Sequence, residues 1–142
     1  MAPDNSYLTK VTDLDTYEGA VQTSTFDPGD TVTVKATVEK ATAYSSPSYT
    51  VVSGTTAARV MVIVYYDDGS KYTLLHYYTI STTLTPGVPF NVQTQFKLSS
   101  GAPIGAGYHT KCLVWSTNLP NGDTLSDWTN FNAEQEVTFS VS

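Results

Sequence analysis

The stretch FDPGDTVTVKATV, residues 26–38, decides the fold of this chain, because a Pro-Gly pair is followed at once by strict alternation. Val32, Val34, Ala36 and Val38 alternate with polar residues. Side chains on a strand point to opposite faces in turn, so this pattern is typical of a strand with one buried face. The stretch therefore predicts a tight turn that leads into a half-buried strand.

The same pattern returns in LTPGVPFNVQTQF, residues 84–96. Pro28 and Gly29 align with Pro86 and Gly87, and apolar residues again alternate with polar ones after the turn. Three interpretations are possible: an active-site loop, an internal repeat of domains, or two strands of one sheet that obey the same rule.

Two of these interpretations fail on the residues themselves. A phosphate-binding loop needs more glycines at a defined spacing and a helix after them. A domain repeat would leave the last segment of the chain unmatched. The repeated pattern therefore predicts two neighbouring strands, with residues 31–39 and 90–98 side by side and antiparallel in one sheet.

Period-two alternation dominates the rest of the chain, and no sustained helical period is found. The segment AARVMVIVYY is apolar on both faces, which favours a central strand, and the DDGS that follows indicates a hairpin. We expect seven to eight strands in an all-β, antiparallel two-sheet sandwich. Besides the two strands above, the expected segments are 7–12, 20–25, 57–66, 71–80, 105–116 and 137–141.

The chain has 142 residues, of which 40% are hydrophobic and only 14% are charged. This length suits one domain, residues 1–142, in which residues 1–6 are expected to be flexible or to derive from an expression start. Net charge is −6 and there is no basic run, which argues against nucleic acid and anionic membrane surfaces as partners.

The longest apolar run, residues 60–66, is too short to span a bilayer, so no membrane insertion is expected. The first residues lack the order of a secretory signal. A surface rich in Thr and Ser and poor in Lys and Arg nevertheless fits an extracellular, cell-surface or virion-surface setting. Cys112 is the single cysteine and cannot form an internal disulfide.

The segment GAPIGAGYHTKCLVWS, residues 101–116, resembles the late-strand pattern of immunoglobulin-like and fibronectin-type-III-like domains of microbial surface or secreted proteins. In that pattern a turn of small residues precedes a Tyr, here Tyr108, and alternating apolar residues follow. The resemblance implies an immunoglobulin-like Greek key with a tyrosine corner, in which the Tyr108 hydroxyl bonds to nearby backbone. It also implies that the two Pro-Gly segments, with Pro28, Gly29, Pro86 and Gly87, begin strands B and E of one sheet.

Carboxylates offer one candidate metal site. Asp13, Asp15 and Glu18 lie in DLDTYEG, which we interpret as a loop, and their oxygens could contribute to a calcium site. Calcium needs six to eight oxygens, however, and the spacing of an EF-hand is absent. The favoured interpretation is therefore a solvated loop with no metal and no cofactor.

Catalysis has little support in the sequence. His76 and His109 are the two histidines, each within an expected strand, and zinc would need two further ligands. No Gly-x-Ser-x-Gly motif occurs, and Cys112 shares its strand face with Tyr108 and is expected in the core. We expect no catalytic residues and a non-enzymatic protein.

Aromatic residues are the better binding candidates. Tyr44, Tyr49, Trp128 and Phe131 fall in long connections, and three tyrosines crowd residues 72–78. Such side chains can stack on sugars or anchor a protein partner. They can equally cover the ends of the sandwich or serve as ordinary strand formers.

Three functional hypotheses follow. The first is an extracellular structural, adhesion or assembly module of a cell-surface or secreted protein, which contacts protein neighbours or itself. The second is a carbohydrate-binding module that holds polysaccharide on the exposed aromatics. The third is a virion or filament surface subunit that self-assembles through residues 7–11.

Overall fold

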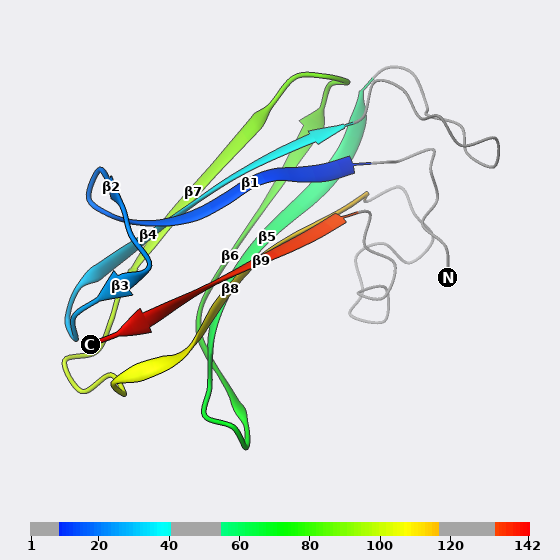
Figure 1. Cartoon of the computed structure of the whole chain (residues 1–142). Helices are drawn as coiled ribbons and strands as arrows, with labels where there is room; N and C mark the ends of the chain where they lie inside the picture. The colour runs from blue at the N-terminus through cyan, green and yellow to red at the C-terminus, as the bar shows by residue number, and fades with distance from the viewer. Residues whose placement is uncertain (1–8, 41–54, 117–132) are drawn as a thin grey trace.

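The chain folds as a two-layered β-sandwich (Figure 1). The computed structural model describes residues 9–40, 55–116 and 133–142, and these contain nine strands and no helix. None of the described residues therefore lies in a helix that could cross a membrane. The strands are β1 (Thr9–Glu18), β2 (Val21–Gln22), β3 (Thr25–Phe26), β4 (Thr31–Lys40), β5 (Thr56–Asp67), β6 (Tyr72–Leu84), β7 (Phe90–Lys97), β8 (Gly105–Ser116) and β9 (Ala133–Val141).

The strand order is that of an immunoglobulin-like Greek key. The first sheet has the order β2-β1-β4-β7, and the second has the order β3-β9-β8-β5-β6. All pairs are antiparallel except β3 with β9. After β2 the chain crosses from the first sheet to the second, where β3 pairs with the last strand. The all-β antiparallel sandwich is confirmed; the two short strands, with two residues each, bring the count above the seven or eight expected.

The two Pro-Gly stretches form the same turn. The Asp30 N–H donates to the Asp27 carbonyl at 3.1 Å, and the Val88 N–H donates to the Thr85 carbonyl at 3.0 Å. The third residue of each turn, Gly29 or Gly87, has a φ of 88° or 75°. Proline at the second position and a positive φ at the third define a type II turn.

The predicted neighbours are confirmed: β4 and β7 are paired from Thr31 opposite Lys97 to Val38 opposite Phe90. Each Pro-Gly turn is also bonded to the far end of the other strand. The Leu98 N–H donates to the Asp30 carbonyl at 2.8 Å, and the Gly87 N–H donates to the Lys40 carbonyl at 3.0 Å. These bonds fix the register at both ends of the pair.

The core consists of the inward-facing rows of both sheets. Half of its members are Val, with exposed fractions between 0% and 4%. The prediction of a central strand at residues 57–66 is confirmed, because β5 lies between β8 and β6. Cys112 is also in this core, as expected, and is fully buried. The buried row of β4 (Val32, Val34, Ala36, Val38) meets that of β5 and β8 (Val60, Val62, Val64, Val114) in one cluster.

The tyrosine corner is present. The Tyr108 hydroxyl donates to the carbonyl of Pro103 at 2.6 Å, and the side chain is 1% exposed. Its ring stacks on Phe139 with centroids 5.1 Å apart and contacts Tyr66 at 4.6 Å. This position therefore joins the turn before β8 to the core.

Strand β1 corrects the expected boundaries. Residues 13–18, interpreted as a loop, are part of β1, which extends six residues beyond the predicted end at Thr12. The reason is a bulge between Val11 and Asp13, where the pairing with β4 shifts register. The extra residue breaks the period-two signal, although Leu14 still faces the core. Within the segment proposed for strand exchange, Thr9–Val11 pair with β4 of the same chain.

The positive φ of Gly29 gives the first testable prediction. A Cβ at Gly29 would meet nothing within 4 Å, so Gly29→Ala would create backbone strain without a clash. We expect a loss of about 1–2 kcal/mol in the free energy of unfolding, measured by chemical denaturation. Gly101→Ala is the matched control, since Gly101 lacks a positive φ and has room for a Cβ. Equal stability of Gly29→Ala and wild type would contradict the turn assignment.

The hydroxyl of Tyr108 gives the second testable prediction. Tyr108→Phe keeps the ring in the core but removes the bond to Pro103. We expect a loss of about 1 kcal/mol in unfolding free energy. Tyr77→Phe, at a side chain 61% exposed, should change stability little. If both variants behave alike, the corner does not stabilise the fold.

Candidate functional site

The predicted contact residues Tyr44, Tyr49, Trp128 and Phe131 lie outside the described residues, so their role stays a prediction. The tyrosines expected to crowd one strand do lie on β6, and they divide between its faces. Tyr72 and Tyr77 are 73% and 61% exposed, whereas Tyr78 packs against the core.

The exposed tyrosines belong to a larger apolar surface on the outward face of the second sheet, which we name the tyrosine patch. Its members share the outward side of β5 and β6 and lie next to one another. Ile63 is opposite Tyr77 in the strand register, and the rings of Tyr65 and Tyr72 meet edge to face at 5.4 Å. Leu74 is 58% exposed. The patch consists of Ile63, Tyr65, Tyr72, Leu74 and Tyr77.

A bulge in β6 creates this patch. Val64 pairs with His76, but Tyr65 pairs with Leu74, so β6 carries one extra residue at Leu75. Beyond the bulge the alternation changes phase, because two residues on one strand oppose one on the other. Tyr72 and Leu74 therefore share the outward face with Tyr77. If alternation continued without a bulge from Tyr77, Tyr72 and Leu74 would face the core. The patch could therefore not be predicted from the alternation in the sequence.

The patch is hollowed beside Lys111, where a depression of about 400 Å³ lies between β5, β6 and β8. It continues through Ile63 into a second buried cluster with Met61 and Leu113. Met61 alternates with core residues of β5, so this cluster is on the outward face of the second sheet. The outward face is thus apolar from the middle of β5 to the β5–β6 hairpin.

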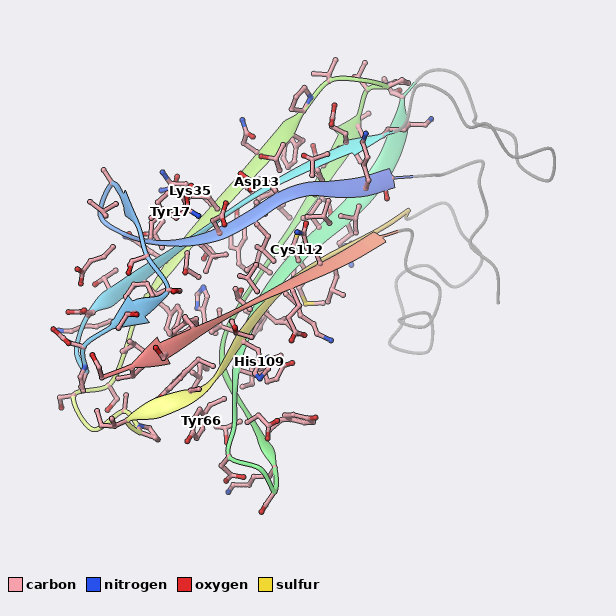
Figure 2. The ribbon with its side chains drawn as sticks, in the orientation of Figure 1. Asp13, Tyr17, Lys35, Tyr66, His109 and Cys112 are labelled. Carbon is pink, nitrogen blue, oxygen red and sulfur yellow. The ribbon has the colours of Figure 1, made fainter. Side chains whose placement is uncertain are left out.

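Charged groups border the patch on one side and are bonded to one another. Glu136 accepts from Tyr65 at 3.3 Å, lies 3.5 Å from the Lys111 ammonium, and is 2.8 Å from Nδ1 of His109. The imidazole of His109 stacks on the Tyr65 ring, with centroids 4.8 Å apart. Figure 2 shows His109 beside the base of the β5–β6 hairpin.

These contacts shift two acid–base equilibria. Partial burial opposes ionisation of Glu136, but the hydrogen bond and charge of His109, together with Lys111 and Tyr65, outweigh it and lower the pKa of Glu136. Burial, and next the charge of Glu136, raises the pKa of Tyr65 to about 12. Glu136 is therefore ionised and Tyr65 protonated at neutral pH.

A second surface lies on the outward face of the first sheet. Asp13, Tyr17 and Lys35 come together there from β1 and β4, as Figure 2 shows. With Asn91 and Gln93 of β7 they line an open groove of about 430 Å³. The Lys35 ammonium lies 4.4 Å from the centroid of the Tyr17 ring. This groove is polar, in contrast to the tyrosine patch.

The candidate calcium ligands are divided between two faces. Asp13 and Asp15 share the outward face of β1, and burial, followed by the hydrogen bond and charge of Asp13, raises the pKa of Asp15. Glu18 is one residue out of phase with them and interacts with Asp30, which raises the pKa of Glu18. Among the described residues, no group of three or more His, Cys, Asp or Glu side chains could hold a metal ion.

Of two candidate reactive groups, Cys112 is buried and His76 is partly buried. Burial raises the pKa of the Cys112 thiol to about 12, so it is not a nucleophile at neutral pH. His76 lies between the sheets, where Nε2 is 2.7 Å from the Thr94 hydroxyl and the ring stacks on Phe96 at 5.4 Å. Burial lowers the pKa of His76, so the folded state favours the neutral imidazole.

A cleft of about 480 Å³ lies at the edge where β6 and β7 face each other. Its wall is largely apolar and includes Tyr66, Leu75, Phe96, Leu98 and Pro103. The buried ring of Tyr108 forms its floor. The apolar patch, the polar groove and this cleft are three of the surfaces that the described residues offer.

No protein-family model matches the chain, and no curated protein matches it in sequence. Solved structures do resemble it. A cycloisomaltooligosaccharide glucanotransferase from Paenibacillus sp., complexed with cycloisomaltoheptaose, aligns over 95% of this chain with a TM-score of 0.60 and 15% identity. A putative β-galactosidase from Bacteroides fragilis aligns over 94% with a TM-score of 0.62 and 14% identity.

The chain spans only 14% and 17% of the length of those two proteins. A Niemann-Pick type C2 protein from the Japanese carpenter ant aligns over the full length of both chains, with a TM-score of 0.55 and 6% identity. At these identities the likeness supports an immunoglobulin-like β-sandwich and extends no further than the fold.

The lowered pKa of His76 gives the third testable prediction. An unfolded histidine titrates near pH 6.5, and the folded one titrates lower. As the pH falls below about 6.5, the unfolded state takes up the proton first, so the contribution of His76 to stability decreases. In His76→Gln this decrease is absent.

Unfolding free energies of wild type and His76→Gln, measured from pH 7.5 to pH 5, test this. We expect the unfolding free energy of wild type, relative to that of His76→Gln, to decrease as the pH falls toward 5. A difference that stays constant or grows on acidification would show that folding does not disfavour the charged imidazole.

Proposed function

We propose that this chain is a non-enzymatic binding module of the immunoglobulin-like kind found in microbial cell-surface or secreted proteins, and that it holds a protein partner on the tyrosine patch. The observation that carries the proposal is the exposure of three large side chains on one face, Tyr72 at 73%, Leu74 at 58% and Tyr77 at 61%. Contiguous apolar surface of this kind, bordered by polar groups, is typical of a protein interaction site.

The chemistry of the patch favours protein over carbohydrate. Tyrosine dominates interface hot spots, and Ile63 and Leu74 add aliphatic surface that a sugar uses poorly. The nearest polar groups are already bonded to each other, since Glu136 is held by His109, Lys111 and Tyr65. A sugar hydroxyl would have to displace these bonds, whereas an apolar protein side chain would leave them intact.

The sandwich supports an adhesion or assembly role by holding the patch rigid. β5 is paired on both sides, and the β5–β6 hairpin carries the patch to the lower edge of the molecule in Figure 1, beyond the other strand ends. The low content of charged residues and the hydroxyl-rich surface support an extracellular or cell-surface location.

The groove on the first sheet supports a second candidate, carbohydrate binding. Asp13, Asn91 and Gln93 can bond to sugar hydroxyls beside an aromatic ring, Tyr17. Lys35 lies over that ring at 4.4 Å, however, on a face that a sugar would need for stacking. For this reason we place carbohydrate second.

Photocrosslinking in the organism that encodes the chain tests the first candidate. With benzoylphenylalanine in place of Tyr77, we expect protein adducts of defined mass. The same group in place of Gln95, exposed on the first sheet, should give none. Tyr72→Ala should weaken binding of the captured partner at least about tenfold, as expected for a hot-spot tyrosine.

Two outcomes would contradict the protein-binding role. One is the absence of adducts at Tyr77, or equal adducts at Gln95. The other is calorimetric binding to a member of a polysaccharide panel that Tyr17→Ala abolishes and Tyr72→Ala leaves unchanged, which would favour the carbohydrate candidate.

A further inference from the structure

Strand β6 is an unusually long sheet edge. It is the last strand in the order of the second sheet, and its 13 residues pair on one side with β5. The other edge strands are shorter. β2 and β3 have two residues each, and β7 has eight residues and ends in the charged Lys97. Natural proteins keep edge strands short or charged because an open edge pairs with other chains.

The sequence of β6, YTLLHYYTISTTL, contains none of the residues that prevent such pairing. It has no Lys, Arg, Asp, Glu, Pro or Gly. Its one histidine points between the sheets toward Thr94. The bulge at Leu75 interrupts only the first part of the strand, so residues 76–84 form a regular edge rich in β-branched and aromatic side chains.

Charge identifies what could pair with this edge. The chain carries a net charge of −6, so two copies repel each other unless they meet along a neutral strip. β6 is such a strip, and pairing it with itself places no like charges opposite one another. An antiparallel pair of identical strands also obeys two-fold symmetry, so the assembly closes at two copies.

We propose that β6 pairs antiparallel with β6 of a second copy of this chain, so that the two second sheets become one continuous sheet across the dimer. The two-fold axis falls at residue 78 if the whole strand overlaps, or at residue 80 if only the regular part does. With the axis at residue 78 the partly buried Tyr78 meets its own equivalent, and with the axis at residue 80 Ile80 does, so in each register a partly buried side chain stabilises the pair through a cross-strand contact. This inference depends on the strand edge and is independent of the tyrosine patch.

Charge substitution near the axis tests the pairing. Thr79 is exposed and lies one residue from the axis in either register. Thr79→Lys and Thr79→Glu should each raise the dimer dissociation constant at least about tenfold, because like charges meet across the axis. An equimolar mixture of the two variants should recover a heterodimer. Analytical ultracentrifugation measures all of these, and circular dichroism checks that each variant is folded.

Thr138→Lys is the matched control, since Thr138 is also exposed but lies on β9, away from the edge. It should dimerise like wild type. A wild-type chain that stays monomeric up to about millimolar concentration would overturn the proposal. A dimer that survives Thr79→Lys, or that Thr138→Lys disrupts equally, would do the same. So would a monomer whose β6 binds an extended peptide of another protein.

Discussion

The rest of the structure depends on the contact between two rows of valine side chains, one from β4 and one from β5 and β8, which meet between the sheets. In the β4 row, the side chains of Val32, Val34 and Val38 are 0% exposed. Strand side chains have a period of two, so a shift of one residue in register would turn the whole row out to solvent. The reciprocal bonds from each Pro-Gly turn to the far end of the neighbouring strand prevent that shift. This explains why the same short pattern occurs twice in the chain.

Burial of the inward rows leaves the outward faces and the strand edges for interactions. The two bulges then decide what those surfaces carry. The bulge near Thr12 keeps Leu14 in the core while Asp13 and Asp15 face solvent. The bulge at Leu75 brings Tyr72 and Leu74 to the same side as Tyr77. One extra residue in each strand therefore produces a polar surface on one sheet and an apolar surface on the other.

Much of the fold could be predicted from local patterns. The alternation after each Pro-Gly turn predicted β4, β7 and their pairing, and the small-residue turn before Tyr108 predicted the tyrosine corner. Prediction failed where local alternation breaks. The bulge near Thr12 hid the second half of β1, so Asp13, Asp15 and Glu18 were interpreted as loop residues.

The candidate site was less accessible to sequence reasoning for the same reason. The crowding of tyrosines in residues 72–78 was visible, but which of them face solvent depends on the bulge, and its place is set by pairing with β5. The association of Tyr65 with His109 and Glu136 joins three strands across the sheet, and no local spacing encodes it.

Hydroxyl-radical footprinting of the purified chain, read by mass spectrometry at single residues, tests most directly the division of side chains between core and surface. We expect rapid oxidation of the exposed Tyr72, Leu74 and Tyr77, slower oxidation of the adjacent Tyr78, and protection of Tyr108. Equal rates at Tyr77 and Tyr78, or protection of Tyr72 with Tyr77, would contradict it, because the faces of β6 would then differ from those described.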